Sequence, residues 1–406
     1  MHVLFVYNFE SMLLPQQRPH HDIAALFAAQ PEFLRVSAPM VRYSKLEFRR
    51  LVRLNGVQLA FTPMMISDSI NNSEKARQNE FTTGPDDQPL VAQFAAKDAT
   101  EFVTSAQLIY PYVDGIDLNC GCPQSWAMAK GYGCGLLRQP EVVREVVQQV
   151  RRTLPSDFSV SVKMRLLGGE SSLERTIELA RQLEQAGATF LTLHGRTPAQ
   201  KHSKDTLDIG AMSEVRQSLR IPLIVNGNVE SWADACELSE KTGAAGVMAA
   251  RGLLANPALF NSAYPEATTT PSACVQQWLD IAEAAGENLL FQCFHHHLTF
   301  MWSADMKRSL RVQFNSLATK SEVLDFLDDH YSIRPSGISP TPAIYTPCSY
   351  THFTPPKHAR HIAAENDEQE WSSKSDGKFF TEFRKHQLTG TGGEDLELGG
   401  LFGEDE

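Results

Sequence analysis

The sequence predicts an α/β protein whose first domain is a (β/α)8 TIM barrel, and three observations lead to this prediction. Short apolar runs recur eight times between residues 33 and 249, and each run ends in small or polar residues. Helical stretches with apolar residues at helical spacing separate the runs. No G-x-G-x-x-G motif follows an early run, which disfavours a doubly wound open sheet, the main alternative.

The predicted strands and helices follow from these runs in order. The strands cover 33–37, 57–62, 89–94, 113–118, 158–164, 189–193, 221–225 and 245–249. The helices between them are clearest over 142–151, 173–183 and 232–241. Gly187 follows the second of these helices as a stop signal, while Ser231 and Gly243 bracket the third as its N-cap and its end.

The pattern changes after Pro257, and the chain divides there. Residues 274–290, 291–302 and 321–330 have helical patterns with no strands between them, which predicts a small all-α domain over 272–333. From 334 to 406 Pro, Thr, Ser and Gly dominate and the end is acidic, so we expect a disordered, low-complexity tail. Residues 1–30 form an N-terminal extension without a clean period, which leaves 31–262 for the barrel.

Composition limits the function classes. No apolar run is long enough to cross a bilayer, so we expect no membrane partner. The seven cysteines are odd in number and widely spread, which favours a reducing compartment over a disulfide framework. We therefore expect a cytoplasmic protein, with the nucleus as the alternative. The net charge of −11 argues against a nucleic-acid partner only weakly, because local basic clusters can still bind phosphates.

In such a barrel the functional residues lie at the C-terminal ends of the strands. Gly227 and Gly252 follow the last two strands, where many barrels bind a phosphate, and Arg251 can donate to the anion. Lys163 adds a cation deep in the mouth, and Gln93 adds an amide. Each residue alone has a structural explanation, but together they favour a phosphate-bearing cofactor. FMN would fit all of these residues, although the pattern alone does not identify the cofactor.

Cys122 lies in a Gly-Cys-Pro turn directly after the fourth predicted strand. A cysteine is commonly a small buried hydrophobe, but this turn is a poor place for a core residue. Zinc binding by Cys120, Cys122 and Cys134 lacks a second ligand pair at the required spacing, so we expect no metal. A thiol with an ordinary pKa of about 8.5 is mostly protonated near neutrality, which makes Cys122 a candidate general acid.

The tract His295-His296-His297 is a second cluster that needs an explanation. Three consecutive residues of a helix point in three directions, so these side chains cannot converge on one metal ion. We expect a solvated or phosphate-facing cluster instead.

Together these motifs resemble the tRNA-dihydrouridine synthases, and most of all the eukaryotic group that modifies positions 20a and 20b of the D-loop. The resemblance runs from about Ile23 to Ile333. It is carried by Ala-Pro-Met-Val-Arg-Tyr-Ser-Lys at 38–45, Asn-Cys-Gly-Cys-Pro-Gln at 119–124, Gly-Tyr-Gly at 131–133, Val-Lys-Met-Arg at 162–165, Leu-His-Gly-Arg-Thr at 193–197, Asn-Gly-Asn at 226–228 and Ala-Arg-Gly-Leu-Leu at 250–254. Two departures are Cys134-Gly135, where the family has Ala-Cys, and an altered segment over 200–208.

The resemblance implies a monomeric enzyme with an FMN-binding barrel, a tRNA-binding helical domain, and NADPH or NADH as the reductant. It implies that a hydride goes to C6 of a uridine and that Cys122 protonates C5. The implied FMN contacts are Pro39, Met40, Val41, Gln93, Lys163, His194, Asn226, Gly227, Asn228, Ala250 and Arg251. Asn119 and Arg165 become candidate substrate contacts.

Basic residues on the barrel rim and in the helical domain are candidate contacts to tRNA phosphates. They are Arg42, Arg49, Arg50 and Arg53 near the first strand, and Lys307, Arg308 and Arg311 in the helical domain. A solvated helix face is the alternative for each of them. Two other functions stay open: an FMN barrel that reduces a free pyrimidine or enone, and a catalytically idle RNA-binding protein. The helical domain disfavours the first, and the intact Cys122 and Lys163 disfavour the second.

Overall fold

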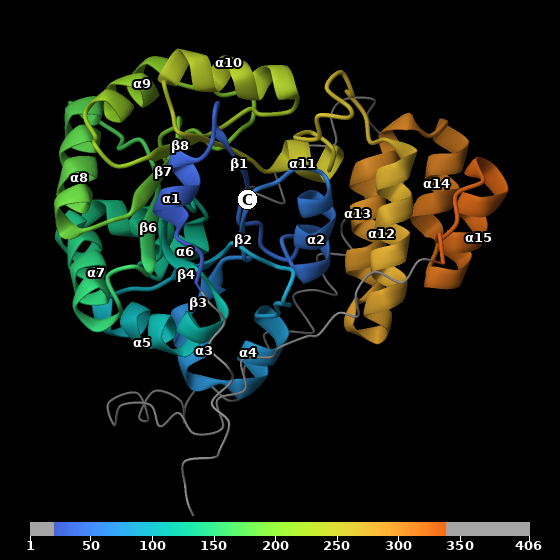
Figure 1. The fold of residues 1–406 in the computed structure, drawn as a ribbon, viewed down its shortest axis with the longest axis horizontal. Helices are drawn as coiled ribbons and strands as arrows, with labels where there is room; N and C mark the ends of the chain where they lie inside the picture. Colours follow the sequence, from blue (N-terminus) through green and yellow to red (C-terminus); the bar gives the residue numbers. More distant parts are fainter. Residues whose placement is uncertain (1–19, 338–406) are drawn as a thin grey trace, which may run out of the picture.

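The computed structural model describes residues 20–337, and its larger part is a closed ring of parallel strands (Figure 1). The pairing of β2 with β4 closes the ring, and the short β3 also pairs with β4. The strands are β1 (Leu34–Ser37), β2 (Leu59–Phe61), β3 (Met65–Ile66), β4 (Leu90–Ala95), β5 (Gly115–Cys120), β6 (Ser159–Arg165), β7 (Phe190–His194), β8 (Leu223–Asn226) and β9 (Gly246–Ala249). The predicted barrel is confirmed, and every predicted strand overlaps an observed one.

Helices surround the strands, which explains why the strands read as continuous apolar runs. β4 and β5 are buried along their whole length, as expected when both faces of a parallel sheet are covered. The helices that surround the barrel are α2 (Leu46–Leu54), α5 (Ala99–Ile109), α7 (Pro140–Thr153), α8 (Ser172–Ala186), α9 (Ile209–Gln217) and α10 (Trp232–Thr242). The shorter helices α3 (Ser67–Asn72), α4 (Glu74–Glu80) and α6 (Ser125–Ala129) lie in connections between strands.

The helix ends agree with the predicted signals. Ser231 caps α10 in a capping box with Asp234, and Gly243 ends the helix with a φ of 67°. Gly187 ends α8 with a φ of 103°. These boundaries were readable from sequence because each depends on residues within one helical turn.

A short helix that the sequence did not predict covers the N-terminal ends of the strands. It is α1 (Ile23–Ala28), and it crosses the barrel in the view of Figure 1. The ring of Phe27 packs 5.4 Å from that of Phe190 at the start of β7, and Ile23 lies against Gly115 at the start of β5. This end of the barrel is therefore sealed, and the opposite end carries the functional side chains. The rest of the predicted extension, residues 1–19, lies outside the described residues.

Four helices after the barrel form a compact group that we call the helical unit: α12 (Ser272–Ala285), α13 (Phe291–Trp302), α14 (Arg308–Ser316) and α15 (Lys320–Tyr331). Three of them were predicted and α14 was missed, while α12 ends earlier than predicted because Gly286 takes a φ of 57°. α2 packs against α12, and α11 (Arg251–Ala255) packs against α13 (Figure 1). Most of the predicted tail, 338–406, lies outside the described residues. Between 20 and 337 no helix could span a membrane.

The histidine tract of α13 is buried, contrary to the expectation of a solvated or phosphate-facing cluster. His295, His296 and His297 are all less than 9% exposed. His295 Nε2 lies 3.0 Å from the carbonyl oxygen of Phe314, and the ring of His297 stacks 4.6 Å from that of Phe48 in α2. The expected divergence of the three side chains holds, but each points into a different packed interface because α13 lies between α2, α11 and the rest of the helical unit.

Candidate functional site

The strand register brings the predicted residues together at the C-terminal ends of the barrel strands. Asn119 of β5 is level with Lys163 of β6. Two residues further along β6, Arg165 is level with His194 of β7, which is level with Asn226 of β8. The sequence could predict this grouping, because parallel strands with short connections present their ends on one side of the barrel.

A buried chain of hydrogen bonds runs below this level from β6 to the Cys122 loop. Ser161 donates to Asp117 over 2.6 Å, and Gln93 Nε2 donates to the other carboxylate oxygen of Asp117 over 2.8 Å. Asn119 Nδ2 donates to Gln93 Oε1 over 2.8 Å, and Asn119 Oδ1 accepts the backbone N–H of Cys122 over 3.0 Å. The chain therefore fixes the position of the cysteine through the side chain of Asn119.

These bonds change the expected roles of two residues. Gln93 is 1% exposed, and both ends of its amide are engaged, so one N–H is left for a cofactor. Asn119 likewise keeps one N–H for a substrate, because only the other one is used, by Gln93. Its oxygen also accepts the backbone N–H of Gly121. Asp117 and Ser161 were missed, although an acid inside an apolar strand was a signal. Burial raises the pKa of Asp117 to about 6.

Cys122 lies in the loop after β5 and is partly buried. Its carbonyl oxygen accepts the backbone N–H of Cys134 over 2.9 Å. Gly133 has a φ of +57°, and a Cβ built there would lie 2.6 Å from the carbonyl oxygen of Cys122, so the close approach of the two loops requires glycine. Burial raises the pKa of the Cys122 thiol, and a hydrogen bond from the backbone of Gln124 and the charges of Arg165 and Lys163 only partly oppose this effect. The thiol is therefore protonated at neutral pH.

Lys163 and Arg165 lie beside Cys122 but differ in what they bind. Burial lowers the pKa of Lys163 to about 8, and the nearby charge of Arg165 adds to the effect. Within residues 20–337, the Lys163 ammonium has no hydrogen bond or ion pair and remains available to a ligand. Arg165 instead donates to the carbonyl oxygens of Gly121, Thr197 and Gln200, which joins the loops after β5 and β7. The geometry gives this arginine a structural task.

His194 is a partly buried imidazole at the end of β7 with an unused ring atom. Its Nδ1 is buried without a hydrogen-bond partner among the described residues. Burial and the four neighbouring cations hold the pKa of His194 well below its usual value, with Arg165 the largest of the charge effects. The ring is therefore neutral at pH 7, and it can donate or accept one hydrogen bond from a bound group.

The loop after β8 and the glycine turn after β9 lie against each other. A Cβ on Gly252 would lie 2.2 Å from the carbonyl oxygen of Val229, so the start of α11 rests directly on the loop after β8. A Cβ on Gly227, which has a φ of +139°, would lie 2.4 Å from Cδ1 of Leu207. Asn228 accepts a hydrogen bond from Arg196 over 2.9 Å, a buried arginine that the sequence did not single out. Arg251 has no hydrogen-bond or ion-pair partner in the described part of the chain.

The remaining predicted cofactor contacts lie around the same opening. Pro39, Met40 and Val41 follow β1 directly, and Val41 is 49% exposed. Ala250 joins β9 to α11, and Asn226 donates to the carbonyl oxygen of Met248 over 2.8 Å. Residues 20–337 contain no group of three or more His, Cys, Asp or Glu side chains that could hold a metal ion.

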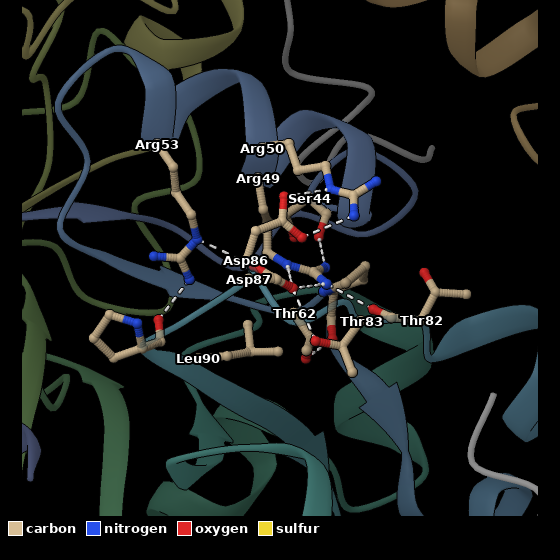
Figure 2. Close-up of polar contacts among 12 residues, drawn as sticks. Ser44, Arg49, Arg50, Arg53, Thr62, Thr82, Thr83, Asp86, Asp87 and Leu90 are labelled. Atoms are coloured by element: carbon tan, nitrogen blue, oxygen red, sulfur yellow. Dashed lines mark hydrogen bonds and ion pairs between the residues drawn. The ribbon is translucent and has the colours of Figure 1, made fainter. Parts of the chain in front are cut away.

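Three arginines predicted to contact tRNA phosphates are engaged in ion pairs (Figure 2). Arg49 is 1% exposed and donates through Nη2 to Asp87 over 2.6 Å. Arg53 Nε donates to the same carboxylate over 3.1 Å, and Arg50 makes two bonds to Asp86. This part of the phosphate-contact prediction is wrong, because Asp86 and Asp87 in the loop before β4 pair with all three arginines.

The basic residues of the helical unit differ from these arginines in exposure. Lys307 and Arg308 are exposed, and Arg311 is partly exposed, at the start of α14. Arg42 is partly exposed in the loop after β1. These residues keep their predicted role as candidates for phosphate contacts.

Comparison with known proteins identifies the family of the chain. A family model described as dihydrouridine synthase (Dus) matches residues 36–333, which include the barrel and the helical unit. A mouse protein named tRNA-dihydrouridine(20a/20b) synthase [NAD(P)+]-like is 44% identical over 317 residues, which are 78% of this chain and 94% of the mouse protein. A human protein of the same name is 42% identical over 78% of this chain and 96% of its own. A fission yeast tRNA-dihydrouridine(20a/20b) synthase [NAD(P)+], from Schizosaccharomyces pombe, is 39% identical over 74% of this chain and 88% of its own. The chain therefore belongs to the dihydrouridine synthase family.

Proposed function

We propose that this protein is a flavin-dependent tRNA-dihydrouridine synthase that reduces the C5=C6 bond of uridines 20a and 20b in the tRNA D-loop. The observation that carries the proposal is the position of Cys122, held at the end of β5 by Asn119, which is level with Lys163 of β6. Family membership and the names of the mouse and human relatives support the choice of substrate.

The cofactor in this proposal is FMN, reduced by NADPH or NADH, and the residues at the mouth fit such a group. Lys163 and Arg251 are cations without partners in the described part of the chain, and His194 Nδ1 is buried and unsatisfied. An anionic group with ring acceptors would satisfy all three, and the meeting glycine turns lie where barrels commonly hold a phosphate. Reduced FMN would supply the hydride for C6 of the uridine.

The protein's own contribution to the chemistry is the proton for C5. Cys122 donates it from a thiol whose raised pKa keeps it protonated at neutral pH. Asn119 accepts the backbone N–H of Cys122, which fixes the position of the cysteine loop at the end of β5. The positive charges of Arg165 and Lys163 stabilise the thiolate that remains after the transfer. A proton from water then restores the thiol.

A uridine inside a folded tRNA must leave its stack to reach this thiol, as in other enzymes that modify bases. The exposed Lys307 and Arg308 of the helical unit provide positive charge for the RNA backbone beside the barrel. This unit favours tRNA over the alternative substrate, a free pyrimidine or enone, because a small molecule that enters the barrel mouth needs no such surface.

The test uses purified protein, FMN, NADPH and an unmodified tRNA transcript, with dihydrouridine mapped along the product. We expect dihydrouridine at 20a and 20b, and none in a transcript that carries cytidine at these positions. Free uridine and a simple cyclic enone serve as competing substrates under the same conditions. Turnover of these small molecules without any modification of tRNA would overturn the proposal in favour of the alternative, and protein that cannot bind FMN would overturn both.

A further inference from the structure

The loop between β1 and α2 contains a tight turn, residues 40–44, whose conformation is unusual. The backbone N–H groups of Tyr43 and Ser44 both donate to the carbonyl oxygen of Met40, over 3.1 and 3.0 Å. The Ser44 hydroxyl closes the turn by accepting the Met40 N–H over 2.9 Å. Between them Arg42 takes a φ of 70°, in the left-handed region that residues other than glycine enter only at a cost. Such a turn persists only where its surroundings impose it.

Helix α13 of the helical unit supplies one side of these surroundings. Tyr43 is 3% exposed, and its hydroxyl lies within hydrogen-bond distance, 3.2 Å, of His296 Nδ1. The Tyr43 ring packs edge-on against Phe300 at 5.3 Å, and the Cys293 thiol donates to the carbonyl oxygen of the strained Arg42 at 3.8 Å. Residues on successive turns of helix α13 therefore contact Arg42 and Tyr43, the two residues at the centre of the 40–44 turn.

The barrel supplies the other side. Arg49 Nη1 donates to the carbonyl oxygen of Ser44 over 2.6 Å, while its Nη2 is bound to Asp87 (Figure 2). The turn is thus clamped between a buried ion pair of the barrel and a helix of the neighbouring unit. It also contains Met40 and Val41, at the mouth directly after β1.

We propose that Tyr43 is a positioning residue through which α13 fixes the 40–44 turn, so that the helical unit supports the cofactor side of the barrel mouth. The inference rests on the proposed function, because it takes Met40 and Val41 to be contacts of FMN. The helical unit then has a role that does not depend on RNA. In the apoprotein, the Tyr43–His296 contact holds the 40–44 turn in the conformation that binds FMN.

The test measures FMN affinity of the full-length apoprotein by quenching of FMN fluorescence, without tRNA. We expect Tyr43→Phe, which removes only the hydroxyl, to weaken FMN binding about 2- to 10-fold and to change the visible circular dichroism of bound FMN. His296→Phe tests the same bond from the side of α13. The double variant should bind FMN no more weakly than His296→Phe alone, since both changes remove one shared interaction.

Tyr331→Phe is the matched control, because it removes a tyrosine hydroxyl from the helical unit itself rather than from the turn. Tyr331 lies in α15 and packs on Trp302, away from the turn. We expect wild-type FMN affinity and an unchanged flavin spectrum for this variant. Equal FMN affinity for Tyr43→Phe and Tyr331→Phe, or independent losses in the double variant, would overturn the role of Tyr43 and leave the proposed function standing. Failure of the wild-type protein to bind FMN would contradict the proposed function itself.

Discussion

The buried carboxylate of Asp87 gives a sharp stability prediction. Asp87 is fully buried and accepts hydrogen bonds from Arg49 and Arg53, so Asp87→Asn leaves two guanidinium groups without their counter-charge. Breaking a buried ion pair by removing one partner costs about 3–5 kcal/mol. The new amide keeps one acceptor oxygen, so we expect a loss near the lower end, about 3 kcal/mol. For a protein of this size that lowers the Tm by roughly 3–5 °C.

Asp86→Asn is the matched control for this prediction. Asp86 is the next residue and also pairs with an arginine, but its side chain is 45% exposed. An ion pair with an exposed partner contributes about 0–1 kcal/mol, so this variant should stay close to the wild type. The assay is urea and thermal unfolding of both variants, followed by circular dichroism. Equal losses in the two variants would refute the argument that burial decides the cost.

The same ion pair predicts how the difference depends on pH. Burial alone would raise the pKa of Asp87, but Arg49 and Arg53 outweigh burial and hold its pKa below the usual value. The stabilisation is therefore complete above the unfolded pKa of about 4 and is lost as the pH falls through the lower folded pKa. The gap in unfolding free energy between wild type and Asp87→Asn should stay constant from about pH 5 to 8 and shrink in acid.

Three further predictions concern the mouth of the barrel. Gly133→Ala places a Cβ only 2.6 Å from the carbonyl oxygen of Cys122, so the cysteine loop must shift. We expect dihydrouridine formation in single turnover to fall at least about 10-fold, with FMN affinity unchanged. Unchanged turnover would show that the cysteine loop tolerates the shift. Asn119→Ala frees the backbone N–H of Cys122, and we expect a similar loss of rate, whereas a change confined to the KM for tRNA would make Asn119 a substrate contact instead. Burial lowers the pKa of Lys163 to about 8, so FMN binding should weaken as the pH rises through 8 in the wild type but not in Lys163→Met, and identical pH profiles would exclude Lys163 as the titrating group.

Features that depend on local sequence could be predicted, and those that depend on distant partners could not. The strands followed from apolar runs, and the ends of α8 and α10 followed from glycine and serine within one turn. The role of Arg49 was predicted wrongly because its partner Asp87 is 38 residues away, and a charge run on a helix is usually solvated. No periodicity marks such a pairing, which forms only when the loop before β4 folds over α2.

The candidate site shows the same limit. The grouping of Lys163, His194 and Asn226 was predictable because it needs only parallel strands in register. The engagement of Gln93 and Asn119 with each other was not, since both amides are equally suited to a ligand or to a neighbouring side chain. α14 was missed because its apolar residues, centred on the buried Phe314, are too few to make a clear helical period.

Cys122→Ser, assayed in two half-reactions, tests the central claim most directly. In the first, NADPH reduces the bound flavin and the loss of its visible absorbance is followed; in the second, the reduced protein meets an unmodified tRNA. We expect flavin binding and reduction as in the wild type, because the thiol takes no part in either. Dihydrouridine formation should fall by a factor of at least about 100, since a hydroxyl is a far weaker acid than a thiol. Dihydrouridine formed at the wild-type rate would contradict the assignment of Cys122 as the proton donor.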